Sequence, residues 1–239
     1  MIRRSKPVIG ITADIDFWTT GRPPRSAYML DATNFEAFRA FGVASVMLPS
    51  EIDCIDDYLD LCDGIVVSGG GYQFQVPEMF RGDGSEPPEK EQRFRFEAEL
   101  TRRCIACQKP LLAICGGFQV LNHVTGGDLV VNLALEREEW SSHSGPGFRD
   151  VVHQVKPVEG TRLAAICGSS GFRVNSMHKQ GVVRVGPHAM KAATAPDGVV
   201  EAIEIPRVPF CVGVQWHPEF MLSEQERQLL AAFVDACRN

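Results

Sequence analysis

The residues best suited to covalent chemistry lie in two short segments of this 239-residue chain. In the first, an apolar run at residues 111–114 ends at Cys115, two glycines follow, and a helical pattern begins. This layout is typical of a nucleophile elbow, where a reactive side chain stands on a sharp turn between a strand and a helix. The helix N-terminus favours a thiolate, and the backbone N–H of Gly116 would point at a developing oxyanion. Cys115 is therefore the candidate nucleophile; the alternative is one more buried thiol at the end of a core strand.

The second segment supplies a base and a group to orient it. Residues 212–216 are typical of a strand, His217 follows at its end, and Glu219 comes two residues later. In an extended chain, residues i and i+2 project to the same side, so the carboxylate could hold the imidazole in one tautomer while its other nitrogen faces a thiol. Cys115, His217 and Glu219 thus form a candidate catalytic triad. The alternative for His217 is a capped strand end with an incidental acidic neighbour.

A run of glycines at 69–71 directly follows the apolar run 64–67. Glycine lets the backbone take positive φ and approach a ligand closely, so an N–H of Gly70 or Gly71 could complete an oxyanion hole with that of Gly116. Two alternatives stand beside this interpretation. One is a phosphate-binding loop, although its Lys-Ser/Thr ending is missing; the other is a flexible turn.

The elements that must position these residues alternate between strand and helix in the first half of the chain. Short apolar runs predict strands buried on both faces at 8–12, 43–48, 64–68 and 110–114. Helical spacing predicts helices at 27–41, ended by Gly42, and at 89–107. Such crossovers return the chain in the same direction and so produce parallel strands.

The second half is less regular. Short strands are predicted at 150–158, 172–175, 199–205 and 210–215, and Ser223 with Glu226 forms a capping box for a helix at 223–237. We therefore expect an α/β fold with a mostly parallel central sheet flanked by helices on both faces. This is a flavodoxin-like three-layer sandwich with a nucleophile elbow and a small antiparallel β extension, built as one domain over residues 1–239.

Charge and hydropathy exclude several classes of protein. The net charge is -6, and the basic residues are scattered along the chain, so no basic stripe predicts a nucleic-acid partner. The apolar stretch near the start is too short for a signal-peptide core, and no run reaches the ~18 apolar residues of a membrane span. We expect no membrane association and a cytoplasmic location.

The eight cysteines predict buried reduced thiols rather than a disulfide scaffold, because they are few for the length and most lie in apolar segments. Cys104 and Cys107 form a single C-x-x-C inside a predicted helix. A metal or redox role there is the minor alternative, since no second pair or histidine pair at zinc spacing accompanies it.

Several longer motifs occur together along nearly the whole chain. They comprise the opening strand 7–12, the glycine turn after the third strand, the Ile-Cys-x-Gly-x-Gln elbow followed by Leu121-Asn122 and Gly126-Gly127, and the segments 174–180, 195–203 and 214–219. In this combination the chain resembles the class I glutamine amidotransferase-like proteins. Within them it resembles the γ-glutamyl-γ-aminobutyrate hydrolase group of cysteine peptidases, peptidase family C26.

The resemblance implies roles for individual residues. The family nucleophile falls on Cys115, the general base and acid on His217, and the orienting carboxylate on Glu219. The same resemblance places substrate-binding residues near the mouth of the site, with a loop held by local side-chain hydrogen bonds as the alternative; these residues are Gln119, Asn175, Ser176 and His178. The remaining histidines match nothing catalytic and are expected to be structural or on the surface; they are His123, His143, His153 and His188.

The implied activity is hydrolysis of a small-molecule γ-glutamyl amide through a γ-glutamyl thioester, with release of glutamate and with no metal or cofactor. Two departures from the family leave the attached amine open: Gly116 replaces the usual Arg, and residues 69–77 replace the usual acidic pattern. Two rival functions share the fold. One is a glutaminase domain that supplies ammonia to a synthase partner, and the other is a non-catalytic binding protein. The sequence also leaves a homodimer open.

Overall fold

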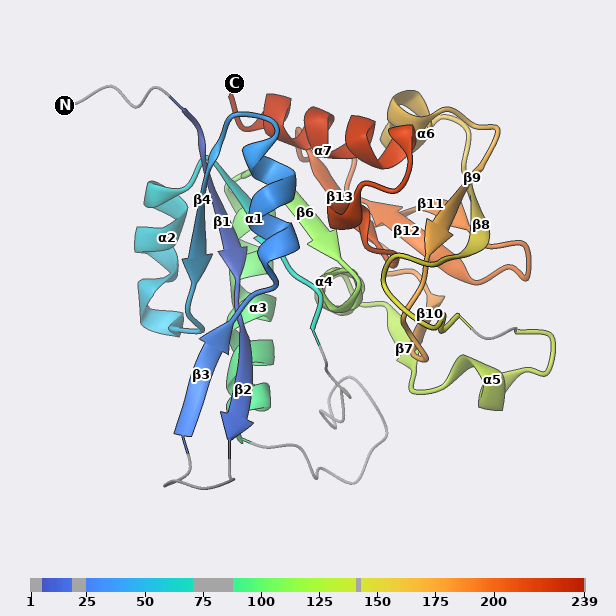
Figure 1. The fold of residues 1–239 in the computed structure, drawn as a ribbon, viewed down its shortest axis with the longest axis horizontal. Coiled ribbons are helices and arrows are strands. Elements are labelled where there is room, and N and C mark those ends of the chain that lie inside the picture. The colour runs from blue at the N-terminus through green and yellow to red at the C-terminus, as the bar shows by residue number, and fades with distance from the viewer. Residues whose placement is uncertain (1–5, 19–24, 71–87, 141–142, 239) are drawn as a thin grey trace.

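A computed structural model of the chain describes residues 6–18, 25–70, 88–140 and 143–238. These residues form an 11-stranded sheet with the order β4-β1-β5-β6-β13-β12-β11-β8-β9, in which β10 also pairs with β12 and with β7. Strands β2 and β3 form a separate two-stranded sheet. The sheet is mixed, and helices surround its parallel part, which confirms the predicted α/β class (Figure 1).

The parallel part of the sheet consists of four strands from the first half of the chain and one from near its end. Its strands are β4 (Ala44–Leu48), β1 (Val8–Thr12), β5 (Gly64–Val67), β6 (Leu111–Ile114) and β13 (Cys211–Val214). Strands β1, β5, β6 and β13 are buried along their full length. This burial on both faces is the reason their sequences are continuous apolar runs rather than alternating ones.

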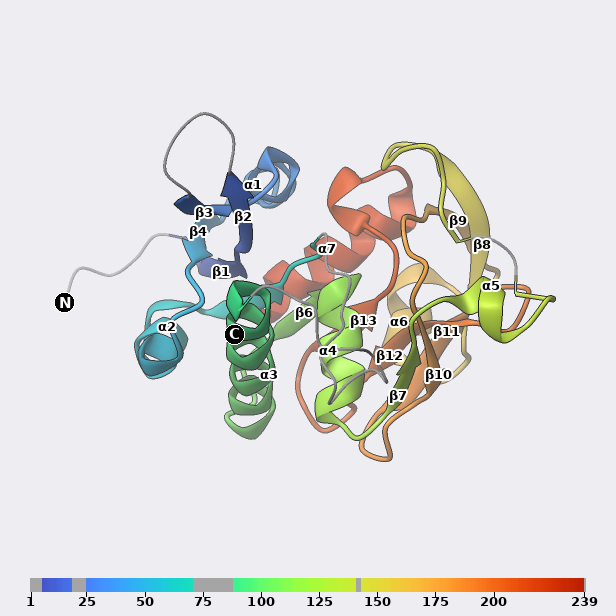
Figure 2. The ribbon, with the colours of Figure 1, turned by 90° about the horizontal axis from the view of Figure 1, so that it is seen from below.

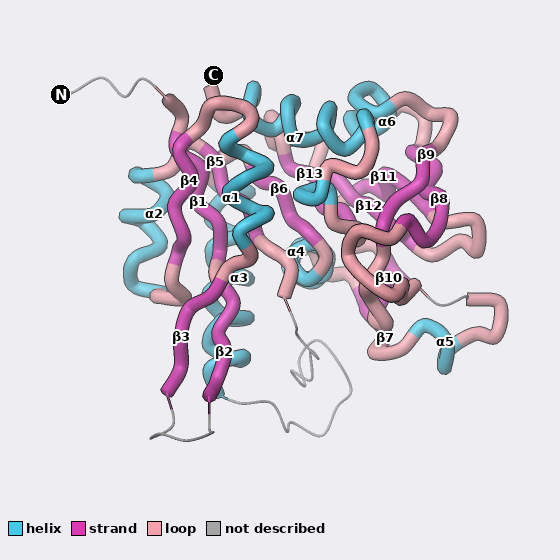
Figure 3. Tube along the Cα trace, viewed as in Figure 1, coloured by secondary structure: helices cyan, strands magenta, loops and turns pink. Residues whose placement is uncertain are grey.

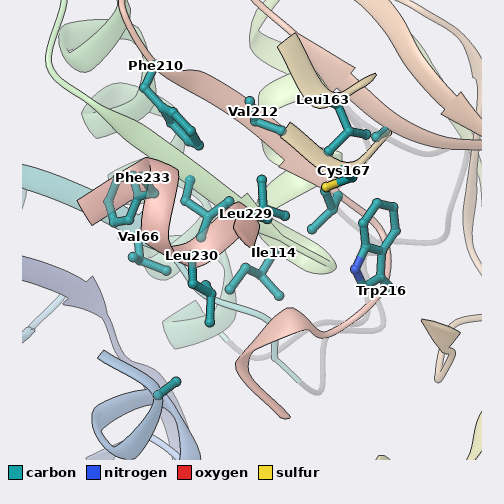
Figure 4. Packing of buried hydrophobic residues seen from close by; sticks show 14 of the residues in the cluster. Val66, Ile114, Leu163, Cys167, Phe210, Val212, Trp216, Leu229, Leu230 and Phe233 are labelled. Carbon is teal, nitrogen blue, oxygen red and sulfur yellow. The ribbon is translucent and has the colours of Figure 1, made fainter. Parts of the chain in front are cut away.

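Helices cover both faces of these strands. Figure 2 shows α1 (Ala32–Arg39) and α7 (Glu224–Ala236) on one side and α2 (Ile55–Leu61), α3 (Pro88–Ala106) and α4 (Gly116–Val124) on the other. On the α7 side, Leu229 and Phe233 pack beside Val212 and Trp216 in one cluster (Figure 4). Fully burying an aliphatic or phenyl side chain of this kind contributes about 1.5–3 kcal/mol.

The second half of the chain extends the sheet beyond β13 with further strands (Figure 3), and these strands pair antiparallel. They are β12 (Val200–Glu204), β11 (Met190–Thr194), β8 (Val151–Pro157), β9 (Phe172–Asn175), β10 (Gly181–Arg184) and β7 (Asp128–Val130). Short helical pieces complete the described chain: α5 (Leu133–Glu136), α6 (Arg162–Cys167), η1 (Ile52–Cys54) and η2 (Pro218–Phe220). The predicted strands at 150–158, 172–175, 199–205 and 210–215 are all present, whereas β7, β10 and β11 were not predicted.

The predicted helix at 27–41 is wrong in its first part. Residues Arg25–Met29 form β3, which pairs with β2 (Asp14–Trp18), and α1 begins only at Ala32. The reason is local: the Asp31 side chain accepts a hydrogen bond from the Thr33 N–H and caps the helix there. Gly42 takes a φ of 72° just after the helix, as expected of a C-terminal stop.

Two further properties concern the whole described chain. None of its helices has both the length and the apolar character needed to cross a bilayer. All eight cysteines lie in the described residues and are free thiols, most of them buried. In the C-x-x-C pair, Cys104 is buried inside α3 as predicted, whereas Cys107 is exposed just after the helix; neither thiol forms a disulfide.

Candidate active site

The predicted catalytic residues come from three neighbouring strands of the parallel sheet. β5 leads into Gly69, β6 ends at Cys115, and β13 leads to His217. Because the carboxyl ends of parallel strands meet at the same edge of a sheet, the three segments converge there. A cavity of about 440 Å³ lies at this edge; it is lined by Asp14, Met29, Leu30, Asp31, Asn34, Gly69, Gly70, Cys115, Phe148, Met177, His217, Glu219 and Phe220.

Cys115 stands on a strained turn between β6 and α4. Its φ of 50° and ψ of -103° are rare for a residue with a side chain, and α4 begins at the next residue, Gly116. A Cβ at Gly117 would lie 2.1 Å from the backbone oxygen of Val67, so only glycine allows α4 to start this close to β5. The geometry is that of a nucleophile elbow, with the thiol held at the N-terminus of a helix.

His217 is paired with Glu219 inside the protein. Its Nδ1 lies 2.7 Å from Glu219 Oε1, and both side chains are more than nine-tenths buried. The pair forms through the 3₁₀ turn η2 rather than along an extended chain, so the predicted reason for the contact was wrong although the two groups do meet. With Nδ1 on the carboxylate, the second ring nitrogen is left available to the thiol, and both His217 and Cys115 lie beside Gly69.

The charges around His217 favour its protonated form. Burial alone lowers the pKa of the imidazole, but the Glu219 carboxylate and the Cys115 sulfur together raise that pKa well above its ordinary value. An imidazolium beside the sulfur stabilises a thiolate. Three other buried thiols have no such partner, and burial raises the pKa of Cys167, Cys211 and Cys237 to about 12.

Asn175, at the end of β9, holds the backbone of His217. Its Oδ1 accepts a hydrogen bond from the His217 N–H at 2.9 Å, and its Nδ2 donates to the His217 carbonyl at 3.2 Å. A pair of amides supports the sulfur in a similar way. Gln215 Nε2 lies 3.5 Å from Cys115 Sγ, and Gln119 Nε2 donates to Gln215 Oε1 at 3.1 Å. Asn175 and Gln119 therefore contact the triad and its supports.

The residues expected to bind substrate do not line the cavity; these are Gln119, Asn175, Ser176 and His178. Ser176 Oγ donates to the His143 carbonyl, and His178 Nδ1 lies 2.8 Å from the Gln180 carbonyl. This arrangement matches the alternative interpretation, a loop held by local side-chain hydrogen bonds. The residue of this loop that does reach the cavity is Met177.

The glycine run contributes to the wall beside the triad. Gly70 lines the cavity, Gly71 lies outside the described residues, and Gly116 follows the nucleophile as the first residue of α4. Sequence analysis missed the role of Gly69: a Cβ there would lie 2.8 Å from His217 Cε1, so a side chain would collide with the imidazole. The sequence indicated the glycine run as a whole, but it did not identify Gly69 as the position that has no room for a side chain.

Sequence analysis also missed the acidic groups of the cavity. Asp14 and Asp31 line it, and Asp14 Oδ1 lies 2.7 Å from Nη1 of Arg93, whose side chain is fully buried. Arg93 Nη2 also donates to the Gly69 carbonyl at 3.2 Å. The same arginine thus ties the acidic wall to the glycine turn. No spacing in the sequence relates these positions, which come from β2, α3 and the turn after β5.

Comparisons with known proteins agree with this geometry. The family model of peptidase C26 matches residues 7–219. The γ-glutamyl-γ-aminobutyrate hydrolase PuuD of Escherichia coli is 33% identical over 198 residues, covering 80% of this chain and 78% of that protein.

Solved structures show the same fold at lower identity. The glutaminase domain of Trypanosoma brucei CTPS with bound acivicin superposes with a TM-score of 0.68 at 17% identity, covering 98% of this chain and 94% of that one. A glutamine amido transferase from Methylobacillus flagellatus superposes with a TM-score of 0.61 at 13% identity, covering 97% and 95%.

Proposed function

The chain belongs to the peptidase C26 family of glutamine amidotransferase-like hydrolases, and we propose that it hydrolyses γ-glutamyl amides with Cys115, His217 and Glu219 as its triad. One observation carries this proposal: the buried imidazole of His217 bonds to the Glu219 carboxylate and lies beside Cys115 at the wall of the same cavity, with both residues next to Gly69. A nucleophile beside a base that is held by an orienting group is the arrangement that acyl transfer requires.

The proposed reaction passes through a covalent intermediate. The Cys115 thiolate attacks the γ-carbonyl carbon, while backbone N–H groups of Gly116 and of Gly70 or Gly71 stabilise the oxyanion. The His217 imidazolium then gives its proton to the departing amine, and the carbon–nitrogen bond breaks. His217 next removes a proton from water, the hydroxide attacks the γ-glutamyl thioester, and glutamate leaves with the thiolate restored.

The cavity wall supports a substrate with a positively charged amino group. Asp14 and Asp31 present carboxyl groups there, and hydrogen bonds from Thr33 lower the pKa of Asp31, so that it stays ionised. The methylene chain of a glutamyl group would lie against the apolar part of the wall, which includes Met29, Leu30 and Phe220. The relative named a γ-glutamyl-γ-aminobutyrate hydrolase makes a γ-glutamyl-amine the first substrate to test.

The experiment is a glutamate-release assay on the purified chain with no partner added. Substrates are glutamine, γ-glutamyl-γ-aminobutyrate, γ-glutamyl-polyamines and polyglutamate. We expect turnover of at least one γ-glutamyl-amine above that of glutamine. Cys115→Ala should abolish turnover, and Cys237→Ala, which removes a buried thiol packed beside Gly64 at the start of β5, should keep it.

Other outcomes of this assay contradict the proposal. Turnover of glutamine alone would favour a glutaminase domain that supplies ammonia to a synthase. Turnover that persists in Cys115→Ala would show that another group is the nucleophile. A folded wild type with no turnover of any substrate, and with Cys115 no more reactive to iodoacetamide than the other thiols, would favour a binding protein.

A further inference from the structure

Three histidines and a glutamate meet in the antiparallel half of the protein, away from the triad. His143 precedes β8, His153 lies on β8, His178 follows β9, and Glu201 lies on β12. One potential ligand atom from each residue lies within 4.8 Å of those of the other three. The side chains of His143, His178 and Glu201 are at most 3% exposed, and that of His153 is 13% exposed.

The ring nitrogens of these histidines converge on one carboxylate oxygen. Glu201 Oε1 lies 2.9 Å from His143 Nδ1, 3.5 Å from His178 Nε2 and 3.7 Å from His153 Nε2. Despite these short distances, none of the four atoms has a well-formed hydrogen bond within the described part of the chain, nor has Glu201 Oε2. Such a group of buried polar atoms is costly unless something bonds to all of them.

The outer nitrogen of each ring has an acceptor that determines the tautomer. His143 Nε2 lies 2.9 Å from Asp197 Oδ2, His178 Nδ1 lies 2.8 Å from the Gln180 carbonyl, and His153 Nδ1 lies 3.2 Å from the Gln154 carbonyl. A carbonyl or carboxylate accepts, so each outer nitrogen can carry the proton of a neutral ring, which leaves each inner nitrogen available as a ligand. Three such nitrogens face the same carboxylate. This is the outer-shell pattern found around metal-bound histidines.

We propose that His143, His153, His178 and Glu201 bind a Zn²⁺ ion in a four-coordinate structural site. Nitrogen and carboxylate oxygen are ordinary zinc ligands, and four protein ligands close the coordination sphere, as in structural sites. Ligands held at about 2.0–2.1 Å around a tetrahedral ion lie about 3.3 Å apart, close to the three distances to Glu201 Oε1. A single proton could satisfy one pair of these atoms, whereas one ion satisfies all four.

A second cavity borders the cluster, and the cluster is connected to the candidate active site. A cavity of about 190 Å³ borders His143 and His178. The two segments that carry these histidines are also bonded together: the His178 N–H donates to the His143 carbonyl at 3.1 Å, and Ser144 pairs with Met177. Met177 lines the active-site cavity, and Asn175 holds His217. The ion would therefore brace the loop behind the triad.

The test uses the full chain and Zn²⁺ itself. Metal content is measured after purification, the ion is removed with a chelator, and Zn²⁺ is titrated back against a chromophoric competitor. We expect one ion per chain and a higher unfolding temperature on binding, because the ion binds the folded state. His153→Gln, at the most exposed ligand, should lose stoichiometric binding and the thermal shift. His188→Gln, the same change at an exposed histidine outside the cluster, should keep both.

Two further measurements distinguish this site from adventitious binding by thiols. Asp197→Asn leaves all four ligands and should weaken zinc binding by about 10- to 100-fold, as expected for an outer-shell partner. Co²⁺ in place of Zn²⁺ should give the visible spectrum of a four-coordinate nitrogen–oxygen site without a thiolate charge-transfer band. A wild type that binds no Zn²⁺ overturns the proposal, as does equal binding by folded His153→Gln or a thiolate band in the Co²⁺ spectrum.

Discussion

At the scale of single residues, Cys115 differs from the other cysteines in its surroundings in the fold. Most of the eight thiols are buried, and burial alone disfavours a thiolate, as the raised pKa values of Cys104 and Cys211 show. Cys115 differs because it lies at a helix N-terminus beside a histidine whose proton is held by Glu219. The carboxylate therefore acts on the sulfur through the imidazole.

Replacing Glu219 by Gln should change how the reactivity of Cys115 depends on pH. The carboxylate raises the pKa of His217 against the opposing effect of burial, so its loss should let that pKa fall and deprotonate the imidazole at neutral pH. Alkylation of Cys115 by iodoacetamide near pH 7 should slow by about tenfold for each unit of the fall. Mass spectrometry of the labelled peptides measures this rate; an unchanged pH profile would contradict the role given to Glu219.

The same pair makes a prediction about stability. The pKa of His217 is higher in the folded chain than its ordinary value of 6.5. The stabilisation from the pair is therefore complete below that ordinary value and is lost as the pH rises through the folded-state pKa. The difference in unfolding free energy between wild type and Glu219→Gln should shrink at alkaline pH, as measured by urea denaturation. A difference that grows with pH would have the wrong sign.

At the scale of elements, the site depends on how closely α4 approaches β5. The two elements touch at Gly117, where the Val67 carbonyl fills the place of a side chain. Since Cys115 is attached directly to the start of α4, any displacement of this helix moves the sulfur relative to His217 on β13. The parallel strands thus determine the edge at which the proposed triad lies, and the helix determines where the thiol stands on it.

Gly117→Ala tests this contact. A Cβ 2.1 Å from a backbone oxygen forces the helix to shift, and overpacking of this kind typically costs 1–3 kcal/mol. We expect a fall in kcat/KM well beyond that of Gly10→Ala on β1, whose Cβ would meet side-chain ends of Leu48 and Cys62 at 2.7 and 2.8 Å, neither of them in α4. Enzyme kinetics and denaturant unfolding on both variants provide the measurement. Equal effects of the two substitutions would mean that the α4–β5 contact does not position the nucleophile.

At the scale of the whole molecule, two hydrophobic layers on opposite faces of one sheet hold the fold together. One layer contains side chains of α1 and α7, and the other contains side chains of α3 and α4. The antiparallel half joins this core through β12 and β13, and its strand β9 supplies Asn175 to the triad. Noncovalent packing carries this arrangement, because all eight cysteines are free.

Reducing agent should therefore leave the thermal stability unchanged. Thermal unfolding with and without dithiothreitol should give the same midpoint, and a thiol assay on the denatured chain should count eight reactive groups. The thermal measurement should also be made on Cys115→Ser. This variant separates an effect of reductant on the fold from an effect on the thiol of the candidate active site. A midpoint that falls in reductant would reveal a disulfide that this structure does not contain.

The sequence by itself determined the elements and residues whose signals are local. Buried parallel strands are continuous apolar runs, so β1, β5, β6 and β13 were predicted near their observed bounds. The elbow at Cys115 and the neighbours His217 and Glu219 were also recognised from short motifs. Prediction was poorer where pairing with another strand decides the conformation. The apolar spacing of β3 is typical of a helix, but its residues pair with β2 and form a strand.

Only the tertiary structure decided which distant residues meet. Asn175 contacts His217, and Arg93 contacts Asp14. Three histidines also gather around Glu201, although no spacing in the sequence links them to it; they are His143, His153 and His178. Each of these contacts joins elements separated by at least one other strand or helix along the chain. Their formation depends on strand order and on burial of polar groups that must find partners, and neither property is written in a local pattern.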